Sequence, residues 1–183
     1  MKERKGVNKM KLIACPSPNF EDRTDRVQFI IIHATGTENL EKTFDYLIDS
    51  KPPHRVSAHY VIDRDGTVYA LVEESKRAWH AGLSDWQEYA VRKGTNSLND
   101  ASIGIELQCP ARSYDEKTKQ VKTFGEFTTE QILTCLELCR RIMKRHKVTP
   151  ERILRHSDVS PGRKFDPGAT FPWAEFKNQL TRE

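Results

Sequence analysis

The chain has 183 residues, of which 37% are apolar and 31% are charged, a balance typical of one globular domain with a sizeable core. Its formal net charge of +4 is mildly basic, but no nucleic-acid-binding motif accompanies it, so we expect no nucleic-acid partner. No apolar run reaches the roughly twenty residues that a membrane-spanning helix needs, which predicts that the chain has no transmembrane segment. We expect the protein to be a monomer.

The first residues bear on the compartment. Residues 1–11 are basic and polar, and the apolar stretch of a secretory signal does not follow them. We therefore expect residues 1–14 to form a flexible extension, residues 15–183 to form the domain, and the protein to be cytoplasmic. Leu12-Ile13-Ala14-Cys15 is similar to the cleavage site of a bacterial lipoprotein. A periplasmic or outer-membrane lipoprotein is the alternative if an upstream signal is missing.

The first half of the domain predicts a strand, a helix and a hairpin. Val27–Ile32 is a continuous apolar, β-branched run, typical of a strand buried on both faces. Apolar residues at helical spacing predict a helix over 40–48. Strand-like segments at 59–62 and 67–72 flank Asp65-Gly66, which is a strong hairpin turn signal.

The second half alternates loops, strands and one long helix. Residues 79–100 are rich in Gly, Ser, Asn and Trp, which predicts a long surface loop, and 102–107 return to strand character. A capping box that starts at Thr128 and an apolar face predict a helix over 129–146. Its Cys135 and Cys139 lie four residues apart on that face, so we expect both to be buried. With a further strand at 153–156, these elements predict a single α/β domain with a central mixed β-sheet flanked by helices.

Two histidines and one aspartate stand where chemistry is expected. His33 follows one apolar strand, His156 ends another, and Asp166 lies ten residues further on in an irregular loop. Three protein ligands would leave the fourth position of a zinc ion open for water, as hydrolysis requires, whereas four ligands close a structural site. Spacing alone leaves open that these side chains are ordinary hydrogen-bonded residues. Four other histidines are alternative ligands: His54, His59, His80 and His146.

Six segments of the chain, in order, resemble one known family. They are CPSPNF from Cys15, IIIHATGT around His33, RVSAHYVIDRDGTVY from Arg55, RAWHAG from Arg77, NDASIGIEL from Asn99, and RHSDVSPGRKFDPGATFPW from Arg155. Together they look like the AmpD-like members of the type 2 N-acetylmuramoyl-L-alanine amidases, which share their fold with peptidoglycan recognition proteins. The resemblance runs from about residue 15 to residue 176, and HSDVSPGRKFDPG is its most specific part.

The resemblance implies a metal site and two catalytic residues. By this match, His33, His156 and Asp166 hold one Zn²⁺ per chain. Glu106 matches the family's catalytic glutamate, which takes a proton from the metal-bound water. Lys164 matches a lysine placed near the scissile carbonyl. On spacing alone, Glu106 reads as an exposed strand carboxylate and Lys164 as a solvated loop charge, and only the match to the family motif reverses both readings.

Substrate contacts also follow from the resemblance. Arg55 matches an arginine that the family uses on the carboxylates of the stem peptide, although it can also be read as a surface arginine. Trp79 and His80 are expected to line the substrate groove, with bracing of the long loop as the alternative. His59 lies in a strand and is expected to be a buried histidine in or behind the site.

The implied function is zinc-dependent hydrolysis of the amide between N-acetylmuramic acid, or its 1,6-anhydro form, and L-alanine of the stem peptide, in cell-wall recycling or turnover. Its partners would be peptidoglycan fragments or murein. Some proteins with this fold have lost zinc and only bind peptidoglycan, but this chain keeps every implied ligand. Ser97 stands where some cytoplasmic members have arginine, and residues 111–126 form a charged insertion. The preference for the anhydro sugar is therefore open, as is the choice between a host enzyme and a phage-derived lysin.

Overall fold

The computed structural model describes residues 10–49, 55–86, 89 and 97–182. The strands are β1 (Leu12–Ala14), β2 (Phe20–Asp22), β3 (Phe29–Gly36), β4 (Tyr60–Ile62), β5 (Val68–Ala70), β6 (Lys76–Ala78), β7 (Ser102–Tyr114), β8 (Val121–Phe124) and β9 (Ile153–Arg155). The helices are α1 (Leu40–Leu47), α3 (Thr129–His146), α4 (His156–Val159) and α5 (Trp173–Leu180), with short 3₁₀ helices η1 (Asn99–Ala101) and η2 (Pro150–Arg152).

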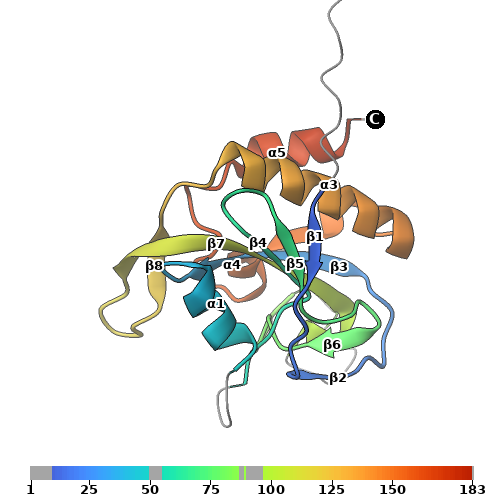
Figure 1. The fold of residues 1–183 in the computed structure, drawn as a ribbon, viewed down its shortest axis with the longest axis horizontal. Helices are drawn as coiled ribbons and strands as arrows, with labels where there is room; N and C mark the ends of the chain where they lie inside the picture. Colours follow the sequence, from blue (N-terminus) through green and yellow to red (C-terminus); the bar gives the residue numbers. More distant parts are fainter. Residues whose placement is uncertain (1–9, 50–54, 87–88, 90–96, 183) are drawn as a thin grey trace, which may run out of the picture.

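A mixed sheet forms the centre of the molecule. Its strands follow the order β1-β5-β4-β7-β3-β9, and β8 pairs with the far part of β7. Strand β3 runs parallel to β7 and β9, whereas the β4–β5 and β7–β8 pairs are antiparallel. Helices α3 and α5 lie along one face, and α1 lies on the other (Figure 1). The prediction of one α/β domain with a central mixed sheet flanked by helices is confirmed.

The alternation of side chains along β3 decides which face carries the site. Ile30 and Ile32 pack into the cluster that includes α3 and α5, whereas Phe29 and Ile31 pack into a second cluster with Leu154. Successive side chains of a strand point to opposite faces. His33 therefore lies on the face of Ile31, away from α3.

Helix α3 follows its sequence signals closely. It spans Thr129–His146, and the Thr128 side chain accepts a hydrogen bond from the backbone N–H of Gln131 while the Gln131 side chain accepts one from the backbone N–H of Thr128. Cys135 and Cys139 are fully buried against the sheet, as predicted. The strands and the turn of the β4–β5 hairpin are confirmed as well, with Gly66 at a φ of +82°.

Three segments differ from the sequence prediction. Strand β3 continues to Gly36, so His33 lies inside the strand rather than at its end. Strand β7 continues to Tyr114 and forms a hairpin with β8, so much of the charged stretch at 111–126 is regular structure. Its charges lie on an exposed edge, while Cys109 and Phe124 pack together at its base. The predicted loop at 79–100 is not wholly on the surface, because His80 and Ala81 are buried.

The N-terminal part enters the sheet earlier than expected. Leu12–Ala14, which we placed in the extension, form β1 and pair in parallel with β5. Residues 1–9 lie outside the described part of the chain. None of the helices formed by the described residues is both long and apolar enough to cross a bilayer.

Candidate active site

Two neighbouring strands bring the predicted histidines together. β9 pairs in parallel with β3, with Ile32 opposite Arg155, and a histidine follows each of these two residues in the chain. His156 is the first residue of α4, directly after β9. Asp166 approaches from the following loop, whose backbone is tied to α4 by a 3.0 Å hydrogen bond from Ser157 N to Asp166 O.

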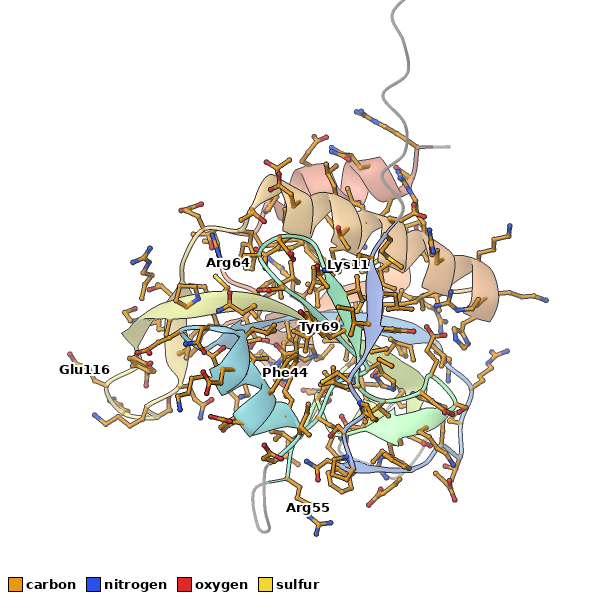
Figure 2. All side chains as sticks on the ribbon, in the orientation of Figure 1. Lys11, Phe44, Arg55, Arg64, Tyr69 and Glu116 are labelled. Carbon is orange, nitrogen blue, oxygen red and sulfur yellow. The ribbon has the colours of Figure 1, made fainter. Side chains whose placement is uncertain are left out.

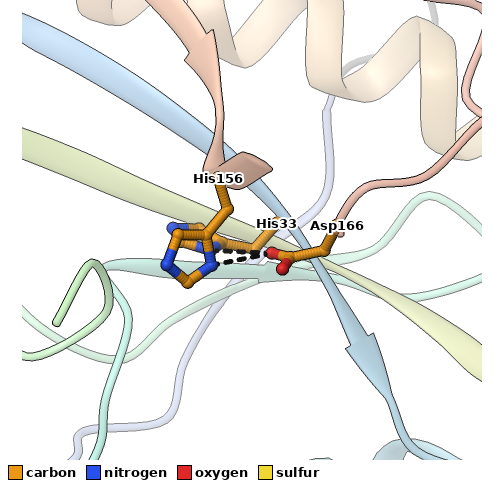
Figure 3. A group of neighbouring side chains, drawn as sticks. All are labelled: His33, His156 and Asp166. Carbon is orange, nitrogen blue, oxygen red and sulfur yellow. Dashed lines mark hydrogen bonds and ion pairs between the residues drawn. The ribbon is translucent and has the colours of Figure 1, made fainter. Parts of the chain in front are cut away.

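The three side chains converge on one point. His33 Nδ1 lies 2.9 Å from His156 Nδ1 and 3.1 Å from Asp166 Oδ2, and His156 Nδ1 lies 3.0 Å from the same oxygen (Figure 3). Tetrahedral zinc with bonds of about 2.0–2.1 Å holds its ligand atoms roughly 3.3 Å apart. Among the described residues, this is the group of histidine, cysteine and carboxylate side chains arranged to hold a metal ion. The three donor atoms therefore suit a metal ion, and they would move slightly apart to bind it.

Burial and charge keep two of these candidate ligands, His33 and Asp166, in the protonation states that bind metal. All three residues are buried. Burial and the neighbouring His156 lower the pKa of His33 to about 4, so its imidazole is neutral near pH 7. Burial alone would raise the pKa of Asp166, but His156 and His33 outweigh it and hold that pKa far below its usual range. Metal binding consequently requires no costly loss of protons at either residue near neutral pH.

Glu106 lies beside this cluster with an unsatisfied oxygen. On β7 it is the register partner of His33, so the two side chains leave the same face of the sheet. Its Oε2 atom is shielded from solvent and has no hydrogen-bond partner among the described residues. Burial, and secondarily the charge of Asp166, raise the pKa of Glu106 to about 8. An orphaned buried carboxyl with a raised pKa is a feature of functional sites rather than of an exposed strand.

A surface pocket lies beside the cluster and Glu106. Glu106, His156, Lys164 and Asp166 line one part of it, and Trp79 lines it as well. Further lining residues come from the end of β3, from the loop after it and from α1, namely Thr35, Thr37, Thr43, Tyr46 and Leu47. The pocket thus contains both implied catalytic residues and leaves space for a substrate beside the cluster.

Lys164 is held by a residue that sequence reasoning missed. Its Nζ donates a 3.1 Å hydrogen bond to Gln120 Oε1, in the turn of the β7–β8 hairpin. The contact joins segments 44 positions apart. No local pattern around Gln120 predicts this hydrogen bond, and from the sequence the hairpin was interpreted as a charged insertion. The lining residues of α1 were also missed, although the position of Thr43 on the apolar face of the predicted helix was a usable signal.

The predicted substrate contacts lie in different surroundings. Trp79 is half-buried and lines the pocket. His80 also borders the pocket, but it is buried, and its Nδ1 lies 3.0 Å from His33 Nε2. Arg55 is exposed, is not among the pocket-lining residues, and extends from the surface (Figure 2). His59 is fully buried, as expected, while His54 lies outside the described residues.

A buried two-histidine, one-carboxylate cluster beside an unpaired glutamate and an open pocket defines a metal-dependent hydrolase type of site. The sequence profile described as N-acetylmuramoyl-L-alanine amidase matches residues 23–169, and the chain belongs to this family. The implied membership in the type 2 amidases is therefore confirmed.

Known relatives agree with this assignment. N-acetylmuramoyl-L-alanine amidase AmiD of Escherichia coli (strain K12) is 34% identical over 161 residues, which cover 84% of this chain and 53% of AmiD. This chain thus spans about half the length of that relative. 1,6-Anhydro-N-acetylmuramyl-L-alanine amidase AmpD of Haemophilus influenzae is 33% identical over 201 aligned positions, with 98% of this chain and 100% of AmpD covered.

A solved structure shows the same fold. It is a complex of E. coli AmiD with the substrate anhydro-N-acetylmuramic acid-L-Ala-D-gamma-Glu-L-Lys. It superposes with a TM-score of 0.68 at 30% identity, covering 96% of this chain and 61% of that one.

Proposed function

We propose that the chain is a zinc-dependent N-acetylmuramoyl-L-alanine amidase, which hydrolyses the amide between N-acetylmuramic acid, or its 1,6-anhydro form, and L-alanine of the stem peptide. The observation that carries the proposal is the convergence of His33, His156 and Asp166 beside the unpaired carboxyl of Glu106. Two imidazole nitrogens and one carboxylate oxygen are donors that suit zinc, and one ion per chain would occupy them.

The residues of the chain divide the reaction between them. Bound zinc would supply a Lewis acid for the amide carbonyl and lower the pKa of a water molecule. Glu106 takes the proton of the attacking water and then donates it to the departing amine, so the amine leaves neutral. The Lys164 ammonium stabilises the negative charge that builds on the carbonyl oxygen, which is worth on the order of 3 kcal/mol for one well-placed donor.

The raised pKa of Glu106 is compatible with its role as a base. Without metal, its carboxyl holds a proton up to a pH of about 8 because of burial and the charge of Asp166. A divalent cation held by the neighbouring triad would favour the carboxylate and lower that pKa. The glutamate would then be ionised when the attacking water arrives and protonated when the amine leaves.

The proposed substrate is a muropeptide or murein, in cell-wall recycling or turnover. The names of the AmpD relative and of the ligand in the AmiD complex both refer to anhydro-muramyl compounds. Trp79 and His80, at the pocket, and Arg55, through the carboxylates of the stem peptide, are the proposed substrate contacts. A cytoplasmic monomer stays a prediction, with the lipoprotein of the cell envelope as its alternative.

Product analysis tests this function. The zinc-loaded protein is incubated with anhydro-muropeptides, reducing muropeptides and whole sacculi, and the products are identified by mass spectrometry. We expect free stem peptide from at least one of these substrates, no release after chelation, and recovery when zinc is restored. The Glu106→Gln variant, which keeps all three ligands, serves as the control and should bind zinc without cutting. A protein that binds zinc and muropeptide but releases no peptide would be a binding module instead.

A further inference from the structure

The outward ring nitrogens of the two candidate ligating histidines both meet one short segment. His33 Nε2 lies 3.0 Å from Nδ1 of His80, and His156 Nε2 lies 3.1 Å from the backbone oxygen of Ala81. Their Nδ1 atoms face Asp166 Oδ2 instead. Two adjacent residues, His80 and Ala81, therefore contact the Nε2 atoms of both histidines.

The direction of the hydrogen bonds can be followed inward from a group that can only accept. Ser102 Oγ donates a 2.6 Å hydrogen bond to the backbone oxygen of Leu98, which uses the only proton of that hydroxyl. His80 Nε2, 3.3 Å from Ser102 Oγ, must then carry a proton and donate it to that oxygen. A neutral His80 consequently has a free lone pair on Nδ1.

That lone pair fixes the tautomer of His33. With His80 Nδ1 as the acceptor, His33 carries its proton on Nε2 and leaves Nδ1 unprotonated. His156 reaches the same state independently, because the carbonyl of Ala81 can only accept the proton of His156 Nε2. Both Nδ1 lone pairs are thereby aimed at the point where the three side chains converge.

The segment of His80 and Ala81 is itself fixed by hydrogen bonds and by close packing. Asn99 Oδ1 accepts hydrogen bonds from the backbone N–H groups of His80, at 3.1 Å, and Ala81, at 2.7 Å. The imidazole of His80 lies against Gly104 on β7, where an added Cβ would come within 2.4 Å of His80 Cγ. Only a residue without a side chain leaves room for the ring. His80 thus has a fixed place between β7 and the ligand.

We propose that His80 is a positioning residue, which orients His33 and holds its Nδ1 unprotonated toward the metal. The inference rests on the proposed zinc site and goes beyond the substrate contact that we first expected of this histidine. Both ring nitrogens of His80 are engaged inside the protein and only 9% of the residue is exposed. Partners of this kind behind a ligating histidine hold its ring in place and raise its basicity.

Two substitutions separate the acceptor from the bulk of the ring. His80→Phe fills the same space but offers no acceptor to His33 Nε2–H, whereas the Oδ1 atom of His80→Asn can occupy the position of the Nδ1 atom. The apparent Kd for zinc is measured by competition with a chromophoric chelator, and the free energy of unfolding of the metal-free protein is measured in urea. We expect His80→Phe to weaken zinc binding by about 10–100-fold, and His80→Asn to stay within about threefold of wild type.

A remote histidine provides the matched control. His146 on α3 pairs with Glu74, away from the cluster, so His146→Phe should change the free energy of unfolding and leave the Kd for zinc unaltered. Wild-type zinc affinity in His80→Phe would overturn the inference, as would an equal loss in His80→Asn and His80→Phe. Wild-type protein that binds no zinc would overturn the proposed function as well. Zinc binding that follows this pattern in a protein without amidase activity would sink the proposed function alone.

A measurement on unaltered protein covers the case in which the variants fold poorly. In ¹⁵N-labelled, zinc-loaded wild-type protein, NMR should place the ring proton of His33 on Nε2 and show a ¹⁵N–¹⁵N coupling from it to Nδ1 of His80. A ring proton on Nδ1 of His80, or no such coupling, would contradict the inference.

Discussion

At the scale of single residues, Glu106 links the site to the stability of the protein. Its pKa is about 8 in the folded, metal-free protein, because of burial and Asp166, against an ordinary value of 4.5. Between these values the folded protein holds more protons than the unfolded chain. The contribution of Glu106 to the free energy of unfolding is therefore largest below pH 4.5 and falls as the pH rises through about 8.

This sign can be tested with Glu106→Gln, whose side chain stays neutral throughout. As pH rises from about 5 to 9, the free energy of unfolding of the chelated wild type should fall relative to the variant by on the order of a few kcal/mol. His33 titrates with the opposite sign, since its pKa is lowered, but it is present in both proteins and cancels in the difference. Urea unfolding at each pH gives the comparison, and parallel curves would contradict the assignment.

Lys164 should act on turnover rather than on metal binding. It lines the pocket without belonging to the three-ligand cluster. We expect Lys164→Met to lower kcat about 10²–10³-fold while the Kd for zinc stays near that of wild type, because a donor to the developing charge is lost. Lys122→Met, at an exposed position of β8, is the control for removing a positive charge. A drop in zinc affinity that accounts for the lost activity would place Lys164 in the metal site instead.

The sequence predicted these residues unequally. Spacing left the roles of His33, His156 and Asp166 open, and the resemblance to the amidases selected two of the six histidines together with Asp166. The hydrogen bond between His33 and His80 joins positions 47 apart and depends on a glycine in a third segment. Neither the hydrogen bond nor the contact with the glycine leaves a periodic or local pattern in the sequence, so the role of His80 could be inferred only from the structure.

At the scale of elements, the start of α3 is a discrete source of stability. The Thr128 side chain caps the helix and also donates a 2.7 Å hydrogen bond to the backbone oxygen of Arg64 in the β4–β5 turn. Thr128→Ala should lower the free energy of unfolding by about 1 kcal/mol. Exposed Thr129, one residue into the helix, is the control, and Thr129→Ala should cost far less. Chemical denaturation of both variants decides, and equal losses would contradict the capping role.

Elements with strong local patterns were predicted well, and others were not. The long amphipathic α3, the apolar β3 and the Asp-Gly turn each carry a signal that tertiary contacts do not override. Strands β1, β2 and β6 have three residues each and lack a turn signal such as the Asp-Gly that marked the equally short β4 and β5. The long β7–β8 hairpin was hidden because its exposed edge is charged, and α5 was missed although Trp173, Phe176 and Leu180 recur at helical spacing.

At the scale of the whole molecule, metal binding should stabilise the fold. The candidate ligands come from β3, from α4 and from the loop at Asp166, so a bound ion would join segments that unfolding separates. At free zinc 100 times the Kd, the free energy of unfolding should rise by about 2.7 kcal/mol over the chelated protein. Thermal unfolding across a zinc series measures this. His33→Ala is the control in which zinc should bring little of that gain, and an equal gain would place the binding elsewhere.

The wide separation of the donors also has a consequence for protein synthesis. Asp166 lies 133 positions after His33 and 10 after His156. A growing polypeptide therefore contains only the first candidate ligand, His33, for most of its translation, and the other two are added close together near the end. Under the proposed function, a polypeptide released from the ribosome before Asp166 has been added lacks one of the three candidate ligands, so we expect it to have no amidase activity.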